Sequence, residues 1–170
     1  MTKANNAVTL GTFIFFLLTL TINTTAFATT REAPTFELPC DSGTVSLEQY
    51  RDQVVYIDFW ASWCIPCKHS FPWLNEMQER YAEDGLKIIA INIDEDKADA
   101  QEFLERMPAS FQIAYDPKGT VADLYRLKVM PSSYLIDRNG NVVHAHKGFK
   151  TSDGTRIEGK IQELLKKDKN

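Results

Sequence analysis

The strongest constraint on this chain is a Cys-x-x-Cys pair placed between a buried strand and a helix. The run from Val54 to Trp60 (VVYIDFW) is almost continuously apolar, β-branched or aromatic, which is typical of a strand covered on both faces. Cys64 and Cys67 follow it and open a predicted helix that extends to about Glu83. At a helix start the two sulfurs can approach within bonding distance, and the first faces unpaired backbone N–H groups. These residues predict a dithiol–disulfide centre at the end of a central strand.

The position of Cys64 at a helix start favours the thiolate form of its side chain. The unpaired N–H groups and the positive end of the helix dipole both stabilise a negative sulfur. A cysteine whose pKa falls from about 8.5 to about 7 is about half thiolate at pH 7, instead of about 3%. The same change makes the sulfur a better leaving group. We therefore expect Cys64 to be the attacking thiol and Cys67 the resolving thiol.

Three other interpretations of the cysteine pair have less support. A zinc site needs about four ligands, and His69 supplies only a third. Covalent c-type haem needs His directly after the second cysteine, where Lys68 stands. A purely structural disulfide is the remaining alternative, although the buried strand before the pair and Pro66 within it favour a redox motif. We therefore expect neither a metal nor a cofactor.

Size and charge narrow the class of protein further. A chain of 170 residues predicts one domain. Its hydrophobic fraction of 44% and charged fraction of 25% are those of a soluble globular protein. A net charge of −4 argues against a nucleic-acid binder, which normally carries a basic stripe. Three cysteines are too few for a disulfide scaffold.

The N-terminus predicts an export signal. Lys3 is followed by an uncharged stretch that holds a 13-residue apolar run (8–20) and then the small-x-small pattern AFA (26–28). The apolar run is short of the roughly 20 residues that span a bilayer. We predict a signal peptide at 1–28 and a domain at 29–170, in a periplasmic or otherwise extracytoplasmic space where thiols tend to become disulfides. An uncleaved membrane anchor is the alternative.

The rest of the chain alternates between strand and helix patterns. The predicted elements are a hairpin with strands at 36–38 and 44–45, a short helix at 46–49, strands at 54–60, 87–93 and 111–115, helices at 64–83, 96–106 and 120–125, strands at 133–136 and 141–146, and a final helix at 157–165. This order predicts an α/β domain with an N-terminal β-hairpin and a central mixed sheet that has helices on both faces. The last two strands form an antiparallel hairpin around Asn139-Gly140.

The motifs together resemble a known family. The segment DFWASWCIPCK, Pro72 five residues after Cys67, and Met130-Pro131 before the strand SSYLID are similar to the thioredoxin superfamily. The export segment, the lead-in FELPCDSGTVSLEQY and the extra element at 94–115 resemble the TlpA/ResA-like group of extracytoplasmic thiol–disulfide oxidoreductases. The resemblance implies a thioredoxin-like fold with a central αβ insertion.

Asp58 is the first site residue beyond the cysteines. It interrupts the apolar strand, where an ionised carboxylate is costly to bury without a partner. The resemblance implies that Asp58 lies behind Cys67 and accepts its proton, a role that suits a desolvated carboxyl group with a raised pKa. The alternative is a solvated aspartate at the strand end.

The resemblance also implies a substrate-binding rim. Pro131 matches a cis-proline that faces the cysteines, and the Met130 backbone is left free to pair with an extended substrate segment. Trp63 would form an apolar lip for a docking polypeptide, with ordinary partial burial as its alternative, whereas Trp60 belongs to the core. Gly148 matches a glycine that lets substrate backbone approach.

Two positions depart from the family pattern. Ser70 stands where ResA-type proteins often carry Glu, and Ala90 stands where thioredoxins carry a lysine near the buried aspartate. Proton transfer is therefore expected to rest on Asp58 and water. The dipeptide Ile65-Pro66 contains neither a charge nor a histidine, which places the redox potential toward the reducing end.

We therefore predict a thiol–disulfide oxidoreductase that reduces exported proteins through Cys64 and Cys67. Its expected partners are disulfide-containing exported proteins and a membrane electron donor, and it is expected to be a monomer that binds no nucleic acid. One alternative is a binding module that holds a metal or an apo-protein thiol through the same cysteines and His69. A thiol peroxidase is a weaker alternative, because Ala61 and Phe59 stand where that chemistry usually needs Thr or Ser and Pro.

The remaining candidates favour structural roles. Cys40 is expected to be a small, partly buried residue, with a regulatory or intermolecular disulfide as the sharper alternative. His144 and His146 share one strand face, which we expect to be solvated rather than a metal site. The acidic run Asp94, Glu95, Asp96 and Asp99 suits helix N-capping better than a calcium loop.

Overall fold

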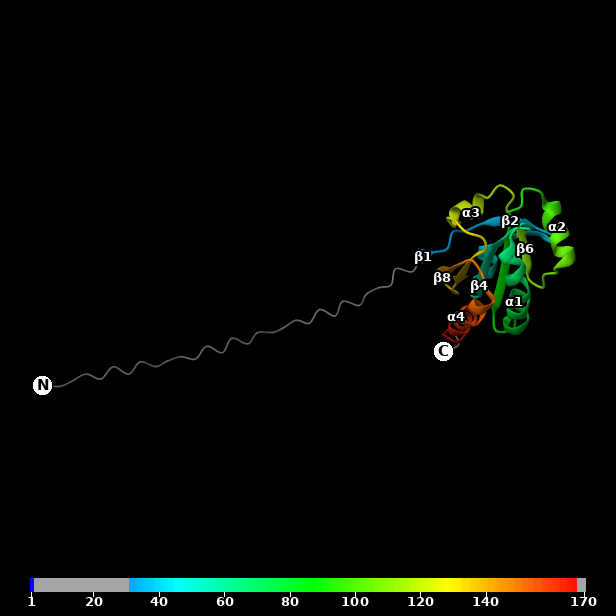
Figure 1. Cartoon of the computed structure of the whole chain (residues 1–170). Helices are drawn as coiled ribbons and strands as arrows, with labels where there is room; N and C mark the ends of the chain where they lie inside the picture. Colours follow the sequence, from blue (N-terminus) through cyan, green and yellow to red (C-terminus); the bar gives the residue numbers. More distant parts are fainter. Residues whose placement is uncertain (2–30, 168–170) are drawn as a thin grey trace.

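A six-stranded mixed sheet organises the protein, with the strand order β1-β8-β7-β4-β5-β6 (Figure 1). The computed structural model describes Met1 and residues 31–167, so the predicted signal peptide lies, apart from Met1, outside the described residues. The strands of the sheet are β1 (Arg31–Glu32), β4 (Val54–Trp60), β5 (Leu86–Asn92), β6 (Gln112–Tyr115), β7 (Ser132–Ile136) and β8 (Asn141–Lys147). A separate antiparallel hairpin is formed by β2 (Glu37–Cys40) and β3 (Gly43–Ser46). The helices are α1 (Ile65–Tyr81), α2 (Lys97–Arg106), α3 (Thr120–Leu124) and α4 (Gly154–Lys167), with 3-10 helices η1 (Leu47–Tyr50) and η2 (Thr151–Asp153).

Strand β4 lies inside the sheet, and all seven of its residues are buried, as the apolar run predicts. It pairs in parallel with β5 and antiparallel with β7, so the sheet is mixed. Parallel neighbours require helices on both faces, which explains why the run is apolar at nearly every position. The chain leaves β4 at Trp60 and enters the loop that carries Cys64.

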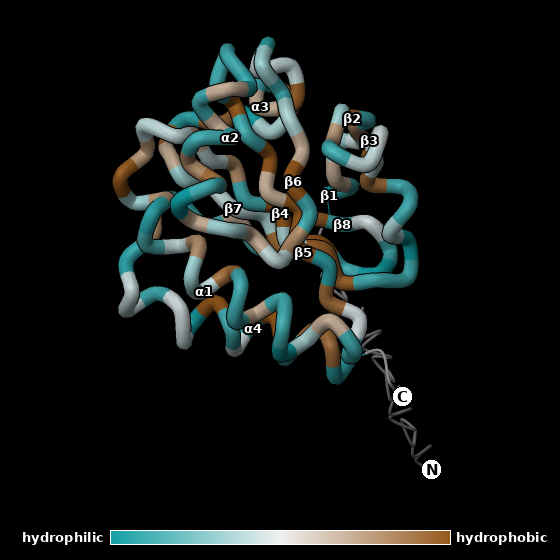
Figure 2. The backbone as a smooth tube through the Cα atoms, turned by 90° about the vertical axis from the view of Figure 1, so that its right-hand side faces the viewer, coloured by the Kyte–Doolittle hydropathy of each residue, from teal (hydrophilic) through white to brown (hydrophobic). Residues whose placement is uncertain are grey.

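Helices cover both faces of the sheet, as predicted. One face packs against α1, α2 and α4, and the other packs against α3 and the β2–β3 hairpin. In Figures 1 and 2, α1 and α4 lie on one side of the sheet and α3 and the hairpin on the other. Successive β4 residues alternate between these layers because side chains of a strand point to opposite faces. Those facing the α1 layer are Val54, Tyr56 and Trp60, and those facing the hairpin layer are Val55, Ile57 and Phe59.

An aromatic cluster joins the end of β4 to two helices. Trp60 lies with its ring centroid 4.8 Å from Phe71 of α1 and 4.8 Å from Phe103 of α2. Phe71 also packs 4.9 Å from Phe103 and 5.3 Å from Phe111. Trp60 and Phe71 are fully buried. The cluster therefore fixes the start of α1, and with it the cysteine pair, against the sheet.

Most predicted elements lie within a few residues of their expected bounds. The predicted short helix is the 3-10 helix η1, where Ser46 N–H donates to Gln49 Oε1 at 3.3 Å. Helix α2 and strand β6 lie within the αβ insertion predicted at 94–115. Two elements were not predicted: the two-residue strand β1 and the 3-10 helix η2. Within residues 31–167, no helix is long and apolar enough to span a bilayer.

Candidate active site

The cysteine pair forms a disulfide at the beginning of α1. Cys64 is the N-cap residue and Cys67 lies in the first turn, with their Cα atoms 5.3 Å apart. The Cys67 N–H donates to Cys64 Sγ at 3.2 Å, so the first sulfur accepts one of the unpaired donors of the helix start. Cys64 is 3% exposed and Cys67 is fully buried. Of the two cysteines, Cys64 therefore keeps the little exposed surface that the pair has, which favours Cys64 as the attacking thiol of the reduced form.

Asp58 lies in β4 on the face that also holds Cys67. Its carboxyl group is 2% exposed, and Oδ2 has no hydrogen-bond partner among residues 31–167. Burial raises the pKa of Asp58 well above its usual range. Because the ionised form is destabilised there, Asp58 is a stronger base than a solvated carboxylate. The alternative of a solvated aspartate at the strand end is wrong.

The neighbours of Asp58 across the sheet supply no charge. Ala90 of β5 stands beside it in the parallel pair, as the departure from the thioredoxin pattern implied. Ser133 of β7 stands opposite it in the antiparallel pair. The Ser133 Oγ accepts a hydrogen bond of 2.7 Å from the Tyr56 hydroxyl group, and this pair is buried. The contact between Tyr56 and Ser133 was not predicted, because 77 residues separate the two in sequence.

The Met130–Pro131 peptide bond is cis, as the resemblance implies. Pro131 immediately precedes Ser132, which pairs with Phe59 near the end of β4, so this segment lies at the sheet end that carries Cys64. Pro131 O accepts a hydrogen bond of 2.8 Å from Gly148 N, which brings two predicted rim residues together. Within residues 31–167, Met130 makes no backbone–backbone hydrogen bond. Its N–H and C=O therefore have no backbone partner in the described part of the chain.

Gly148 and the exposed apolar side chains complete this rim. Gly148 has a φ of 74°, and no atom lies within 4 Å of a Cβ built on it, so conformation rather than crowding explains the glycine. Trp63 is 64% exposed and Ile65 is 67% exposed, so the alternative of ordinary partial burial for Trp63 is wrong. Val129, next to Met130, is 46% exposed. Trp60, by contrast, is buried in the core as predicted.

Ser70 has a local structural role. It lies buried in α1, and its hydroxyl group donates to the Cys67 carbonyl oxygen at 3.1 Å. Ser70 stands where ResA-type proteins often carry a glutamate. At this position α1 therefore supplies a hydroxyl group and no carboxylate.

Cys40 lies apart from the disulfide. It is buried at the end of β2, and its sulfur is 3.4 Å from Ser42 Oγ. Cys40 packs in the hairpin layer, whereas Cys64 and Cys67 pack in the α1 layer on the other face of the sheet. Intramolecular exchange between Cys40 and the pair would therefore require the sheet to open.

The expectation of a solvated face for His144 and His146 is wrong. The His146 side chain is only 13% exposed, and its Nε2 lies 3.4 Å from Asp153 Oδ2. Burial, followed by the nearby Arg156, lowers the pKa of His144. The sequence does not reveal this, because α4 covers that strand only after the chain has folded. No group of three or more metal-ligating side chains is present in the described part of the chain.

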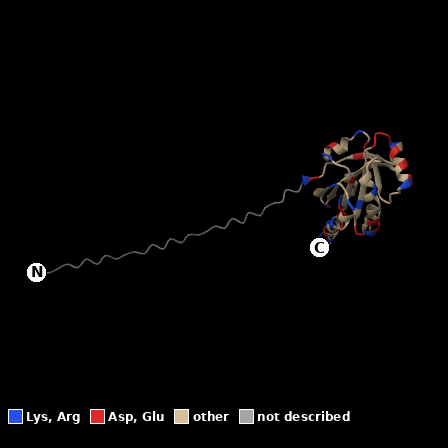
Figure 3. Cartoon of the chain, in the orientation of Figure 1, with Lys and Arg blue, Asp and Glu red and all other residues tan. Residues whose placement is uncertain are grey.

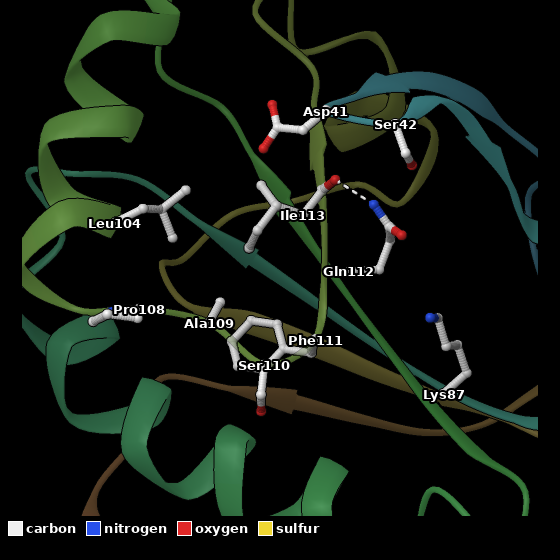
Figure 4. A pocket seen from close by; sticks show the side chains of 10 residues that line it. All are labelled: Asp41, Ser42, Lys87, Leu104, Pro108, Ala109, Ser110, Phe111, Gln112 and Ile113. Carbon is white, nitrogen blue, oxygen red and sulfur yellow. Dashed lines mark hydrogen bonds between the residues drawn. The ribbon is translucent and has the colours of Figure 1, made fainter.

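A cavity of about 510 Å³ opens along β6 and the loop that precedes it (Figure 4). Within it, Gln112 Nε2 donates to the Ile113 carbonyl oxygen at 2.9 Å. The residues that line the cavity are Asp41, Ser42, Lys87, Leu104, Pro108, Ala109, Ser110, Phe111, Gln112 and Ile113. None of these residues belongs to the disulfide or to the predicted rim, so the cavity is separate from the exchange site.

The disulfide lies at a helix start, at the same end of the sheet as a cis-proline, and the comparisons with known proteins agree with this geometry. The match to the AhpC/TSA family covers residues 29–145. This chain belongs to the thioredoxin-like AhpC/TSA family. Thiol-disulfide oxidoreductase ResA of Oceanobacillus iheyensis is 32% identical to it over 137 residues, which are 78% of this chain and 70% of the relative.

Two solved structures support the fold of this AhpC/TSA-family protein. A Chlorobium tepidum protein provisionally named thiol:disulfide interchange protein DsbE has a TM-score of 0.79 and 47% identity, over 80% of this chain and 96% of that one. The exposed lipoprotein thioredoxin of Streptococcus pneumoniae strain TIGR4 has a TM-score of 0.66 and 28% identity, over 77% of this chain and 100% of that one. This AhpC/TSA-family protein is thus a thioredoxin-like thiol–disulfide oxidoreductase with the pair Cys64 and Cys67. The predicted resemblance is confirmed.

Proposed function

We propose that this oxidoreductase reduces disulfide bonds of exported proteins outside the cytoplasm. The observation that carries the proposal is the disulfide at the start of α1, in which Cys64 is the less buried cysteine and Ile65-Pro66 places no charge between the sulfurs. Without a cation to stabilise the reduced thiolate, the potential lies toward the thioredoxin end of the range. The Cys67 N–H still supports the thiolate needed for attack.

The reaction proceeds in two exchange steps. The Cys64 thiolate attacks one sulfur of a substrate disulfide, forms a mixed disulfide and releases the other substrate sulfur as a thiolate. Cys67 then loses its proton to the Asp58 carboxylate and attacks the Cys64 sulfur. The Cys64–Cys67 disulfide forms and the second substrate thiolate leaves. Two electrons from a dithiol of a membrane donor return the pair to the reduced state, and Asp58 releases its proton to water.

The rim around the disulfide is suited to an extended polypeptide. Trp63, Ile65 and Val129 expose apolar surface, and the free backbone groups of Met130 can pair with a substrate strand. Backbone hydrogen bonds depend little on the side chains of the bound segment, so this surface can bind many different substrates. This arrangement favours a protein disulfide over a small molecule as the substrate.

The export pattern at 1–28 and the name of one relative support the location. The protein from Streptococcus pneumoniae is described as an exposed lipoprotein. We propose that residues 29–170 form the working domain, which acts as a monomer after export.

A redox titration of the purified protein against glutathione tests the direction. We expect a potential close to that of thioredoxin, about −270 mV. A potential close to that of the periplasmic oxidase DsbA, about −120 mV, would show an oxidant and overturn the proposed direction.

A further inference from the structure

We propose that Asp94 is a positioning residue that holds the active-site loop and thereby sets the stability of the Cys64–Cys67 disulfide. The proposal rests on the exchange chemistry of this pair and concerns a residue that the sequence pattern assigned to helix capping. Acidic residues, coloured red, lie along α2 and the loop before it (Figure 3). Of the acidic run, Asp96 is the residue whose side chain caps α2, since its Oδ1 accepts from Ala98 N at 2.9 Å. Asp94 points elsewhere.

The carboxylate of Asp94 binds the loop between β4 and α1. The Ser62 N–H donates to Oδ2 at 2.9 Å and lies 3.2 Å from Oδ1, and the Ser62 hydroxyl group donates to Oδ1 at 3.0 Å. Ser62 and Asp94 are 32 residues apart in sequence, and Asp94 is only 4% exposed. Hydrogen bonds to a carboxylate are stronger than neutral ones, and burial protects them from competing water.

The carboxylate is itself held by the end of β5. Asn92 Nδ2 donates to Asp94 Oδ2 at 2.8 Å, and the Asp94 N–H donates to Asn92 Oδ1 at 3.1 Å. Asn92 is 1% exposed and pairs with Trp60 at the end of β4. Asp94 is therefore fixed to the central sheet through its Oδ2 and its backbone N–H, so Ser62 is attached to a rigid support rather than to a mobile loop.

The loop transmits this restraint to the sulfur. Ser62 lies two residues before Cys64, and the Cys64 N–H donates to the Ala61 carbonyl oxygen at 3.1 Å, which closes the turn. The direction of the Cys64 side chain therefore depends on where Ser62 is held. A loop that can shift would lower the effective concentration of the two thiols toward each other.

The effect of Asp94 on the disulfide can be measured as an equilibrium with glutathione. In this equilibrium, the protein dithiol and oxidised glutathione give the protein disulfide and two molecules of reduced glutathione. The equilibrium constant measures how well Cys64 and Cys67 are placed to join. It can be measured on the full chain whether the protein reduces exported proteins or not, so failure of the proposed function and failure of this inference are distinguishable.

The test compares variants of Asp94 with a matched control. Asp116 is also buried, at 1% exposed, and caps α3 by accepting from Thr120, Val121 and Ala122 at 2.9 to 3.0 Å. We expect Asp94→Ala to lower the equilibrium constant at least fivefold and Asp94→Asn, which keeps one acceptor oxygen, to lower it less. We expect Asp116→Ala to reduce stability but to leave the constant within twofold of the wild-type value.

Two results would overturn the assignment. One is a constant for Asp94→Ala within twofold of wild type, and the other is an equal fall in Asp116→Ala, which would indicate general loosening. If Asp94→Ala does not fold, Ser62→Ala decides the matter, because it removes only the hydroxyl bond. We expect a twofold to threefold fall for Ser62→Ala, and no fall contradicts the proposal.

Discussion

At the scale of single residues, the site depends on a buried carboxyl group whose sheet neighbours carry no charge. Asp58 lies between Ala90 and Ser133 across the sheet, and neither can offset its negative charge. Its desolvation therefore lowers stability whenever it is ionised, and the same desolvation makes it a useful base. The strand pattern was enough to single out Asp58. The hydrogen bonds of Asp94 and Ser133 could not be predicted, because they join residues that are distant in sequence.

The raised pKa of Asp58 leads to a prediction about stability. Between the unfolded pKa of about 3.8 and the higher folded pKa, the folded state binds more protons than the unfolded state. Stability therefore falls as pH rises through this window and stays reduced above it, by about 1.4 kcal/mol per pKa unit of difference. We expect Asp58→Asn to remove this loss. Urea unfolding at several pH values should show an advantage of the variant over wild type that grows from pH 4 to pH 8.

The exposed Glu83→Gln is the control, and we expect no such trend from it. A constant difference between Asp58→Asn and wild type across this pH range would contradict the account. In the reduced protein, Asp58→Asn should also slow the closing attack of Cys67 while Cys64 still forms mixed disulfides. Rapid-quench measurement of the two steps separates these effects.

At the scale of elements, α4 packs beside α1 on the same face of the sheet. Trp73 of α1 lies close to Gly154, the first residue of α4, and its ring centroid is 5.8 Å from Tyr56 of β4 and 5.5 Å from Phe149. The Tyr81 hydroxyl group of α1 donates to Glu158 Oε1 of α4 at 2.5 Å. The helical periodicity of α4 was visible in the sequence, but its contacts were not. This is why its start at Gly154, rather than 157, and its cover over the histidines of β8 were missed.

Two glycines of α4 provide a matched pair of substitutions. A Cβ at Gly154 would lie 2.9 Å from Trp73 Nε1, whereas a Cβ at Gly159 would meet no atom within 4 Å. We expect Gly154→Ala to lower the free energy of unfolding by about 1–3 kcal/mol, because it overpacks the α1–α4 contact. We expect Gly159→Ala to raise it by about 0.5–1 kcal/mol. Chemical denaturation measures both, and equal effects of the two substitutions would contradict this packing.

At the scale of the whole molecule, the sheet brings two distant segments to one end. The Cys64 loop follows β4, and the segment from Met130 to Pro131 precedes β7, its antiparallel neighbour. The alternation of strands and helices predicted the mixed α/β sheet, because few topologies suit buried strands with short connections. The meeting of these two segments was implied only by the resemblance to the thioredoxin superfamily. The activity of a thiol–disulfide oxidoreductase then depends on a few residues at that end. The rest of the fold keeps these residues in place.

The central claim is that Cys64 attacks substrate disulfides and Cys67 resolves the product. Trapping in cells tests it most directly: Cys67→Ser and Cys64→Ser variants are expressed with the full chain, and mixed disulfides are separated on non-reducing gels. The account predicts that Cys67→Ser accumulates mixed disulfides with several exported proteins, which disappear on reduction, and that Cys64→Ser does not. The absence of adducts in Cys67→Ser, or their accumulation in Cys64→Ser instead, would contradict the account.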